Sequence, residues 1–201
     1  MATDSPAARR MREAAIAEFA ERGYGASSTR DIAARIGLSA AAMYPHYRSK
    51  EELLYAISVD GHRGALEALR SADSATDPPL HRLKAVVAAF AHWQAQHTAL
   101  ARVVQYEIRS LTTAHYRHVR QLRQDTTAVL RKILVAGQAS GDFDVEPVEG
   151  ILLAISSLCV DVCRWFPSKT FRQPGQVGAL YADLAAKIVG RGAGDTTTPG
   201  D

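Results

Sequence analysis

Apolar residues recur three and four positions apart over most of the chain, which is the spacing of one face of an α-helix. Met11, Ala15 and Phe19 belong to the first such stripe. No Asn-Gly or Asp-Gly pair joins two alternating segments, so β-hairpins are not indicated. We therefore predict an all-α fold of about nine helices. After the first stripe, the expected helices span residues 29–36, 40–47, 50–72, 79–97, 98–110, 112–140, 147–166 and 175–190.

Capping residues predict where two of the early helices begin. Ser28 precedes Asp31 by three positions, which is close to a capping box. Ser49 precedes Glu52 by the same spacing and is expected to form a full capping box at the start of a long helix.

Two glycine-containing turns separate the short N-terminal helices. Gly23 and Gly25 end the first helix where a positive φ is favourable. Between residues 29–36 and 40–47, Gly37 is expected to form a left-handed corner, Leu38 to fill the core and Ser39 to cap the next helix. Two short helices joined in this way and braced by a first helix form a helix-turn-helix, whose second helix enters the major groove of DNA.

The net positive charge is concentrated at the N-terminus. The chain has 24 Lys and Arg against 21 Asp and Glu, and residues 1–50 hold eight of the basic and five of the acidic groups. The remaining residues are balanced at 16 against 16. This asymmetry indicates an anionic partner, such as nucleic acid, for the N-terminal part.

Composition excludes several classes of protein. A chain of 201 residues with 47% hydrophobic residues can bury a core without disulfides or metals. No stretch approaches the roughly 18 apolar residues of a membrane span, and no apolar segment near the N-terminus indicates a secretory signal. Two cysteines do not indicate an oxidised scaffold. We expect a cytoplasmic protein that does not associate with membranes.

The segment FAERGYGASSTRDIAARIGLSAAAMYPHYRSKEELL, from Phe19 to Leu54, resembles the DNA-binding domain of the TetR family of bacterial repressors almost position by position. The family pattern combines F-x-x-x-G-[FY], I-A-x-x-A-G-[VL]-S and Y-x-[HY]-F-x-[SN]-K. The resemblance implies a helix-turn-helix DNA-binding domain over residues 8–54 and a ligand-binding and dimerisation domain over residues 55–190. The tail at residues 191–201 has no apolar anchor and is expected to be disordered.

The same resemblance implies which residues contact DNA. Base edges would be read at Arg30, Ala40 and Ala41. The phosphate backbone would be contacted at Thr29, Ser39, Tyr44, His46 and Lys50. The physical chemistry agrees for Thr29 and Lys50, because each is expected at a helix N-terminus, where free N–H groups favour a phosphate.

The expected recognition helix departs from the family pattern in two ways. Alanines occupy residues 40–42, and alanine can touch a thymine methyl but cannot read a guanine. We therefore expect Arg30, together with Tyr44, to carry more of the base discrimination, with DNA shape supplying the remainder. Pro45 removes an amide donor near the end of this helix, while Met43 and Tyr47 are expected in the core.

The C-terminal part shows no catalytic constellation. His81, His92, His97, His115 and His118 have no partner nucleophile, and no HExxH, CxxC or glycine-rich phosphate loop occurs. We therefore predict that the protein is not an enzyme and has no cofactor or metal site. Cys159 and Cys163 are four residues apart and could supply two metal ligands or a redox pair, but buried apolar thiols are the favoured interpretation.

Two features of the C-terminal part indicate a ligand. Residues 102–132 hold seven basic and two acidic groups, which would suit an anionic ligand or form a solvated face. The segment Arg164-Trp165-Phe166-Pro167 and the helix after it loosely resemble TetR members that sense acyl-CoA thioesters in fatty-acid or steroid catabolism. Candidate ligand contacts, some of which could equally belong to the core, are Trp93, Tyr106, Arg109, Tyr116, Arg120, Arg123, Arg164 and Trp165.

The last two long helices are apolar on more than one face, which is typical of an interface. By resemblance they would form a four-helix dimer bundle, and a twofold dimer would read an inverted repeat. We therefore predict a ligand-responsive repressor that binds double-stranded DNA as a homodimer and is released by a small effector, with an acyl-CoA thioester as one candidate. The alternatives are a small-molecule carrier with vestigial DNA binding and, less favoured, a helical-bundle enzyme.

Overall fold

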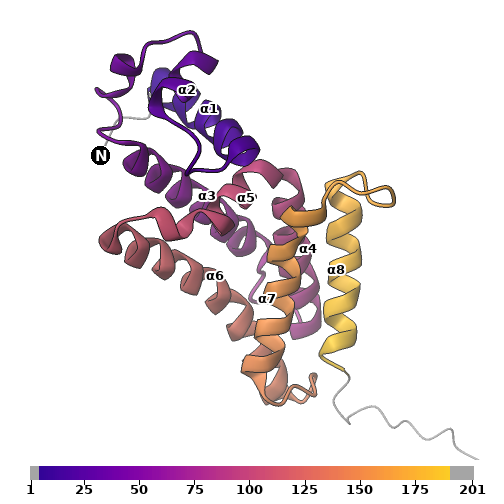
Figure 1. The fold of residues 1–201 in the computed structure, drawn as a ribbon. Coiled ribbons are helices and arrows are strands. Elements are labelled where there is room, and N and C mark those ends of the chain that lie inside the picture. The colour runs from indigo at the N-terminus through magenta and orange to yellow at the C-terminus, as the bar shows by residue number, and fades with distance from the viewer. Residues whose placement is uncertain (1–4, 191–201) are drawn as a thin grey trace, which may run out of the picture. The chain divides into compact units, whose positions relative to one another are not determined.

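The computed structural model describes residues 5–190 of the chain. Over this range it contains eight α-helices, two short 3₁₀ helices and no β-strand, which confirms the all-α prediction (Figure 1). The expected disordered tail, residues 191–201, lies outside the described residues. In chain order the elements are α1 (Pro6–Arg22), α2 (Thr29–Arg35), η1 (Ala40–Met43), α3 (Lys50–Ala72), α4 (Pro79–Gln96), α5 (Thr98–Tyr106), η2 (Ile108–Ser110), α6 (Thr113–Ser140), α7 (Val148–Trp165) and α8 (Pro174–Ile188).

Two expected helices were wrong in type or length. Residues 40–47 do not form an α-helix: η1 ends at Met43, because Pro45 has no N–H to donate to the Ala41 carbonyl and its ring would clash with that carbonyl. Tyr44 N donates to Ala41 O instead, at 3.3 Å. The helix expected over residues 98–110 is divided into α5 and the separate 3₁₀ turn η2, so two of the nine expected α-helices are altered.

The chain folds into two compact units. Unit 1 comprises Met1–Gly64 and His97–Arg123, and unit 2 comprises Ala65–Gln96 and Gln124–Asp201. Helices α3 and α6 each begin in unit 1 and end in unit 2. The predicted boundary between residues 54 and 55 falls inside α3, of which about the first two thirds lie in unit 1 together with all of α5 and the first turns of α6.

Unit 1 has its own apolar core. Phe19 of α1, Ile32 of α2, Leu53 and Ile57 of α3 and Val119 of α6 are almost completely buried and pack in one cluster. Met43 and Tyr47, which flank the recognition turn, belong to the same cluster, as predicted. The helix-turn-helix is therefore held in place by residues that follow it by more than 40 positions in the sequence.

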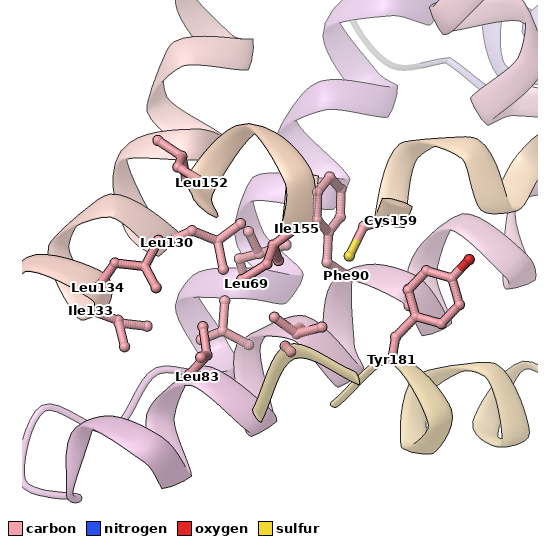
Figure 2. Packing of buried hydrophobic residues seen from close by; sticks show 14 of the residues in the cluster. Leu69, Leu83, Phe90, Leu130, Ile133, Leu134, Leu152, Ile155, Cys159 and Tyr181 are labelled. Carbon is pink, nitrogen blue, oxygen red and sulfur yellow. The ribbon is translucent and has the colours of Figure 1, made fainter. Parts of the chain in front are cut away.

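Unit 2 is built around α4, which packs along α8 and α7. Its core joins Leu69, Phe90, Leu134, Ile155 and Tyr181, which come from α3, α4, α6, α7 and α8 in turn (Figure 2). Gly178 allows α8 to approach α4 closely, since a Cβ atom at this position would lie 2.9 Å from the carbonyl oxygen of Ala88. The two cysteines are buried in this unit, and burial raises the pKa of the Cys159 thiol to about 12, so both act as apolar core residues, as favoured from the sequence.

Candidate nucleic-acid interface

The first turn of α2 is fixed by a reciprocal cap. Ser28 Oγ accepts a hydrogen bond from the Asp31 amide at 3.2 Å, and the Asp31 carboxylate accepts one from the Ser28 amide at 2.9 Å. The Ser28 hydroxyl also donates to the Asp31 carboxylate at 2.5 Å, and this hydrogen bond, followed by the one from the Ser28 amide, holds the pKa of the Asp31 carboxyl below its usual range. The expected cap is confirmed, and it leaves Thr29 half-buried and Arg30 exposed at the helix N-terminus.

The turn after α2 is a Schellman motif. Leu38 N donates to Ala33 O at 2.9 Å, Gly37 N donates to Ala34 O at 3.1 Å, and Gly37 has the predicted positive φ of 69°. Leu38 was expected to fill the core, but 38% of its surface is exposed, because the motif turns the chain outward at this residue. The side chain of Ser39 also makes no capping hydrogen bond, so its expected capping role was wrong: the four-residue 3₁₀ turn that follows is stabilised through the Ser39 carbonyl, which accepts from Ala42 N.

The recognition segment presents a small, mixed surface. Ser39 and Ala41 are exposed, and Tyr44 has 55% of its surface exposed. Ala40 and His46 are half-buried, and His46 Nδ1 lies 3.5 Å from the hydroxyl of Ser5, which caps α1. The predicted DNA contacts of this segment therefore remain available to solvent, with Tyr44 the most prominent.

Lys50 holds the loop between α1 and α2. Its ammonium group donates to the carbonyls of Tyr24 at 2.7 Å and Ser27 at 2.6 Å, and it lies 4.0 Å from the centre of the Tyr24 ring. Burial lowers the pKa of Lys50. An ammonium group has three donors, so one is left for the phosphate contact that the resemblance implies. Sequence reasoning missed the two carbonyl partners, because no local spacing links residue 50 to residues 24 and 27.

An ion pair between a buried carboxylate and an exposed arginine fixes α2 against α1. The Glu18 carboxylate is almost fully buried and accepts from Arg35 Nε at 2.6 Å, and Arg35 also pairs with the exposed Glu21. These two carboxylates raise the pKa of the Arg35 guanidinium, with Glu21 the larger cause. The crossing of α1 and α2 that supports the recognition segment therefore depends on a charged contact as well as on the apolar core.

The first turn of α3 is tied to the start of α6. Glu52 N donates to Ser49 Oγ at 3.0 Å, but the Glu52 carboxylate accepts from the Arg48 amide, so only half of the expected capping box forms. Glu51, for which no prediction was made from the sequence, accepts a hydrogen bond from Thr112 N at 2.8 Å and lies 2.9 Å from His115 Nδ1. Sequence reasoning missed this contact, which spans more than 60 residues.

The candidate ligand contacts do not form one group in the structure. Tyr106, Arg109, Tyr116, Arg120 and Arg123 lie in unit 1. The first four of these side chains are exposed, and Arg123 is half-buried and donates to Gln105 Oε1 at 3.3 Å.

The other three candidates, Trp93, Arg164 and Trp165, lie in unit 2. Trp93 and Trp165 are half-buried against the core, and the Trp165 ring lies 6.0 Å from Phe171 and 6.4 Å from Tyr181 between ring centres. Arg164 is exposed and pairs with Asp161 of its own helix at 2.7 Å.

Neither a metal site nor a membrane span is found in the described part of the chain. Between residues 5 and 190, no group of three or more His, Cys, Asp or Glu side chains is placed to hold a metal ion. Over the same range, no helix combines the length and apolar character needed to cross a membrane.

Comparisons with known proteins agree with this geometry. The family described as bacterial regulatory proteins, tetR family, matches residues 12–57, and the family described as tetracyclin repressor-like, C-terminal domain, matches residues 76–189. A bacterial regulatory protein of the tetR family from Rhodococcus RHA1 is 46% identical in sequence. Its solved structure has a TM-score of 0.90, and the match covers 93% of this chain and 98% of that one.

Two further relatives are more distant. The HTH-type transcriptional repressor KstR2 of Mycobacterium tuberculosis is 29% identical over 84% of this chain and 86% of its own length. The solved structure of KstR2, described as a ketosteroid transcriptional regulator, has a TM-score of 0.80 and covers 92% of this chain and 95% of that one. AibR was solved in complex with isovaleryl coenzyme A and operator DNA. It is 19% identical to this chain, with a TM-score of 0.80, and the match covers 89% of this chain and 97% of AibR. This similarity shows that the two proteins share a fold.

The braced helix-turn-helix, with Arg30 and Tyr44 exposed beside a capped helix N-terminus, defines a DNA-binding regulator of the helix-turn-helix class. The family matches cover both the helix-turn-helix and most of the following helical region. The chain belongs to the tetR family of bacterial regulatory proteins, which is a family of transcriptional regulators and not of enzymes.

Proposed function

We propose that this protein is a transcriptional repressor that binds an inverted-repeat operator as a homodimer and leaves it when a small-molecule effector binds. The observation that carries the proposal is the recognition surface of unit 1. The capping box of α2 and the Schellman turn hold Thr29, Arg30, Ala41 and Tyr44 on short, firmly braced elements. KstR2 is named a transcriptional repressor and is similar over most of this chain, which supports repression and not activation as the function of this protein.

Arg30 is proposed to read base edges. It is exposed at the start of α2, and a guanidinium group can make two hydrogen bonds to a guanine, whereas Ala40 and Ala41 cannot. Binding should be measured by fluorescence anisotropy on the intergenic DNA beside the protein's own gene and on a random duplex of equal length. Arg30→Ala should weaken operator binding by about 1–3 kcal/mol and leave the random duplex almost unchanged.

Two results would count against this assignment. Equal weakening on both duplexes would make Arg30 a backbone contact, and no change on either would remove it from the interface. If the wild-type protein binds neither duplex at low salt, the repressor proposal is wrong and the carrier alternative is favoured.

The dimer is proposed to form through α7 and α8. Leu153 has 68% and Leu158 has 40% of its surface exposed on α7, in a helix whose other face is buried in the core of unit 2. Exposed leucines of this kind on a terminal helix favour burial against a second copy of the chain.

The effector is proposed to be an acyl-CoA thioester bound by unit 2, with Trp165 and Trp93 contacting its apolar part and Arg164 its phosphates. Trp165 and Phe171 are half-buried and pack with the buried Tyr181, and this aromatic cluster includes the residue that follows the exposed Arg164 in the chain. The isovaleryl coenzyme A bound to AibR supports a CoA thioester, and the word ketosteroid in the description of KstR2 supports a steroid as one candidate for its acyl part.

A panel of fatty-acyl and steroid-acyl CoA thioesters, with free CoA as control, tests the effector in two assays. The correct thioester should raise the melting temperature and release the operator in a gel shift, because only a ligand that prefers the non-binding conformation can induce. Trp165→Ala should remove both effects, whereas Arg30→Ala should keep the thermal stabilisation. If no thioester in the panel acts in either assay, the acyl-CoA proposal is wrong.

A further inference from the structure

Residues 97–123 give unit 1 a second basic surface outside the helix-turn-helix. This segment contains five arginines and one acidic residue. Arg109 on η2 and Arg117 and Arg120 on α6 are exposed, and so is Tyr116 on α6. Within residues 5–190, none of these three guanidinium groups has a carboxylate or hydrogen-bond partner. We call Arg109, Tyr116, Arg117 and Arg120 the α6 basic surface.

The net positive charge of the chain lies in unit 1, the unit that contains this surface. Unit 1 has 14 Lys and Arg against nine Asp and Glu, a net charge of +5, whereas unit 2 has ten against 12, a net charge of −2. The basic stretch at residues 102–132, which suggested an anionic ligand in the C-terminal part, is therefore divided. Arg131 belongs to unit 2 and pairs with Glu149 at 2.7 Å, while the arginines without partners belong to the unit that carries the helix-turn-helix.

Contacts along two helices place the start of α6 beside the start of α3 (Figure 1). Glu51 contacts Thr112 and His115, and the Tyr55 ring stacks on His115 with ring centres 3.7 Å apart. One turn further along, the Tyr55 hydroxyl lies 2.5 Å from His118 Nδ1. Successive turns of α3 thus meet successive turns of α6, so the two helices run parallel here with their first turns level. Lys50, where the phosphate contact is expected, is the first residue of α3.

Burial distinguishes this surface from a small-molecule site. A small ligand is normally held in a concave site that removes most of its surface from water, whereas Arg109, Arg117 and Arg120 are exposed. Arg117 and Arg120 are three residues apart on one helix and so lie on neighbouring positions of the same face. A row of exposed arginines, joined through one apolar core to a helix-turn-helix, has the charge and the continuity that suit a DNA backbone.

We propose that the α6 basic surface is a second phosphate-binding surface, which contacts the DNA backbone next to the half-site read by the helix-turn-helix. This inference rests on the operator binding proposed above. It assigns Arg109, Tyr116 and Arg120 to DNA and not to the effector. Its contacts would add affinity and salt dependence without adding sequence discrimination, because phosphates are the same at every base pair.

The test compares salt dependence in full-length variants. Operator binding of wild type and of Arg117→Gln/Arg120→Gln is measured by anisotropy from 50 to 300 mM KCl, roughly the range over which phosphate contacts are screened. The double variant should bind severalfold more weakly at low salt, and the slope of log K against log salt should fall by about one per lost phosphate contact. The weakening should be equal on operator and random duplexes.

Matched controls separate this effect from a general loss of charge or of fold. Arg172→Gln removes an exposed arginine of unit 2 and should leave the slope unchanged. Arg117→Lys/Arg120→Lys keeps the charge and should keep the wild-type slope. All three variants should melt within a degree or two of the wild type, because surface substitutions rarely change stability by more than about 0.5 kcal/mol.

Two results would overturn the proposal. A double variant with the wild-type slope has lost no phosphate contact. A double variant that binds DNA like the wild type, but is not released by the fatty-acyl or steroid-acyl CoA thioester that releases the wild type, shows that the arginines serve an effector. Failure of the wild-type protein itself to bind the intergenic DNA is a different outcome, and it removes the proposed function together with this inference.

Discussion

At the scale of single residues, the Glu18 carboxylate shows how a buried charge can support a recognition surface. Its Oε2 atom is bound by Arg35, while its Oε1 atom makes no hydrogen bond and lies 3.6 Å from Arg22 Nη1. The group is thus only partly compensated, and it is sensitive to any change in its partners.

We predict that Glu18→Gln lowers the free energy of unfolding by about 1–3 kcal/mol, because the buried charge pair with Arg35 is lost. Glu21→Gln is the matched control, since this carboxylate contacts the same arginine but is exposed, and it should change stability little. Urea unfolding followed by circular dichroism measures both. Equal losses for the two variants would contradict the importance of burial.

His62 predicts how stability depends on pH. Burial lowers the pKa of its imidazole from 6.5 to about 4, and the positive charge of Arg123 adds to this, while Nε2 has no hydrogen-bond partner. The unfolded chain takes up this proton near pH 6.5 and the folded chain only near pH 4, so stability is lost as the pH falls between these values.

For His62→Leu we expect a smaller loss of stability in acid than for the wild type. The difference in slope between pH 6.5 and pH 4 should be roughly 1 kcal/mol per pH unit, and it should vanish above pH 7. Urea unfolding at a series of pH values measures it. Parallel curves for the two proteins would show that His62 does not carry this dependence.

At the scale of elements, α4 and α8 approach each other closely at one glycine. We predict that Gly178→Ala lowers the free energy of unfolding by about 1–3 kcal/mol. The new Cβ would lie too close to the Ala88 carbonyl oxygen, which belongs to the backbone of α4 and cannot rotate away as a side chain could. Gly175→Ala in the same helix meets nothing within 4 Å and should be neutral or slightly stabilising. Thermal unfolding of both variants checks this, and similar melting temperatures would show that the helices can separate at no cost.

Most helix ends could be predicted because their causes are local. The helix expected over 50–72 is found at Lys50–Ala72, and the one over 79–97 ends one residue earlier, at Gln96, since prolines, glycines and caps act within a few residues of where they stand. The prediction of an α-helix over residues 40–47 was wrong, because Pro45 cannot donate to the Ala41 carbonyl and the segment forms a 3₁₀ turn with Tyr44 N as the donor instead.

The candidate site was predictable in its chemistry but not in its long-range contacts. The exposure of Arg30 and Tyr44 follows from helix caps and turns, which depend on residues close to them in the sequence. No short-range pattern in the sequence predicts that Glu51 pairs with His115 or Lys50 with the Tyr24 carbonyl, because these contacts depend on how whole helices pack.

At the scale of the whole molecule, the proposed dimer makes a prediction about assembly. Leu158→Asp should convert the protein to a monomer, because a charged group at the centre of an apolar interface is left without a partner. Val135→Asp places the same charge on another exposed apolar residue, on α6, and should remain dimeric. Sedimentation velocity distinguishes the two, and a dimeric Leu158→Asp variant would exclude α7 from the interface.

Unit 1 is assembled from two segments of the chain, with residues 65–96 between them. During synthesis on a ribosome, the N-terminal helices emerge long before Val103, Val104 and Val119, which complete their core. The helix-turn-helix therefore cannot reach its final stability until about three fifths of the chain has been made. A chimaera that carries this recognition surface onto another effector domain would have to bring both segments with it, since a cut after residue 54 divides α3 and removes the apolar residues of the second segment from the core.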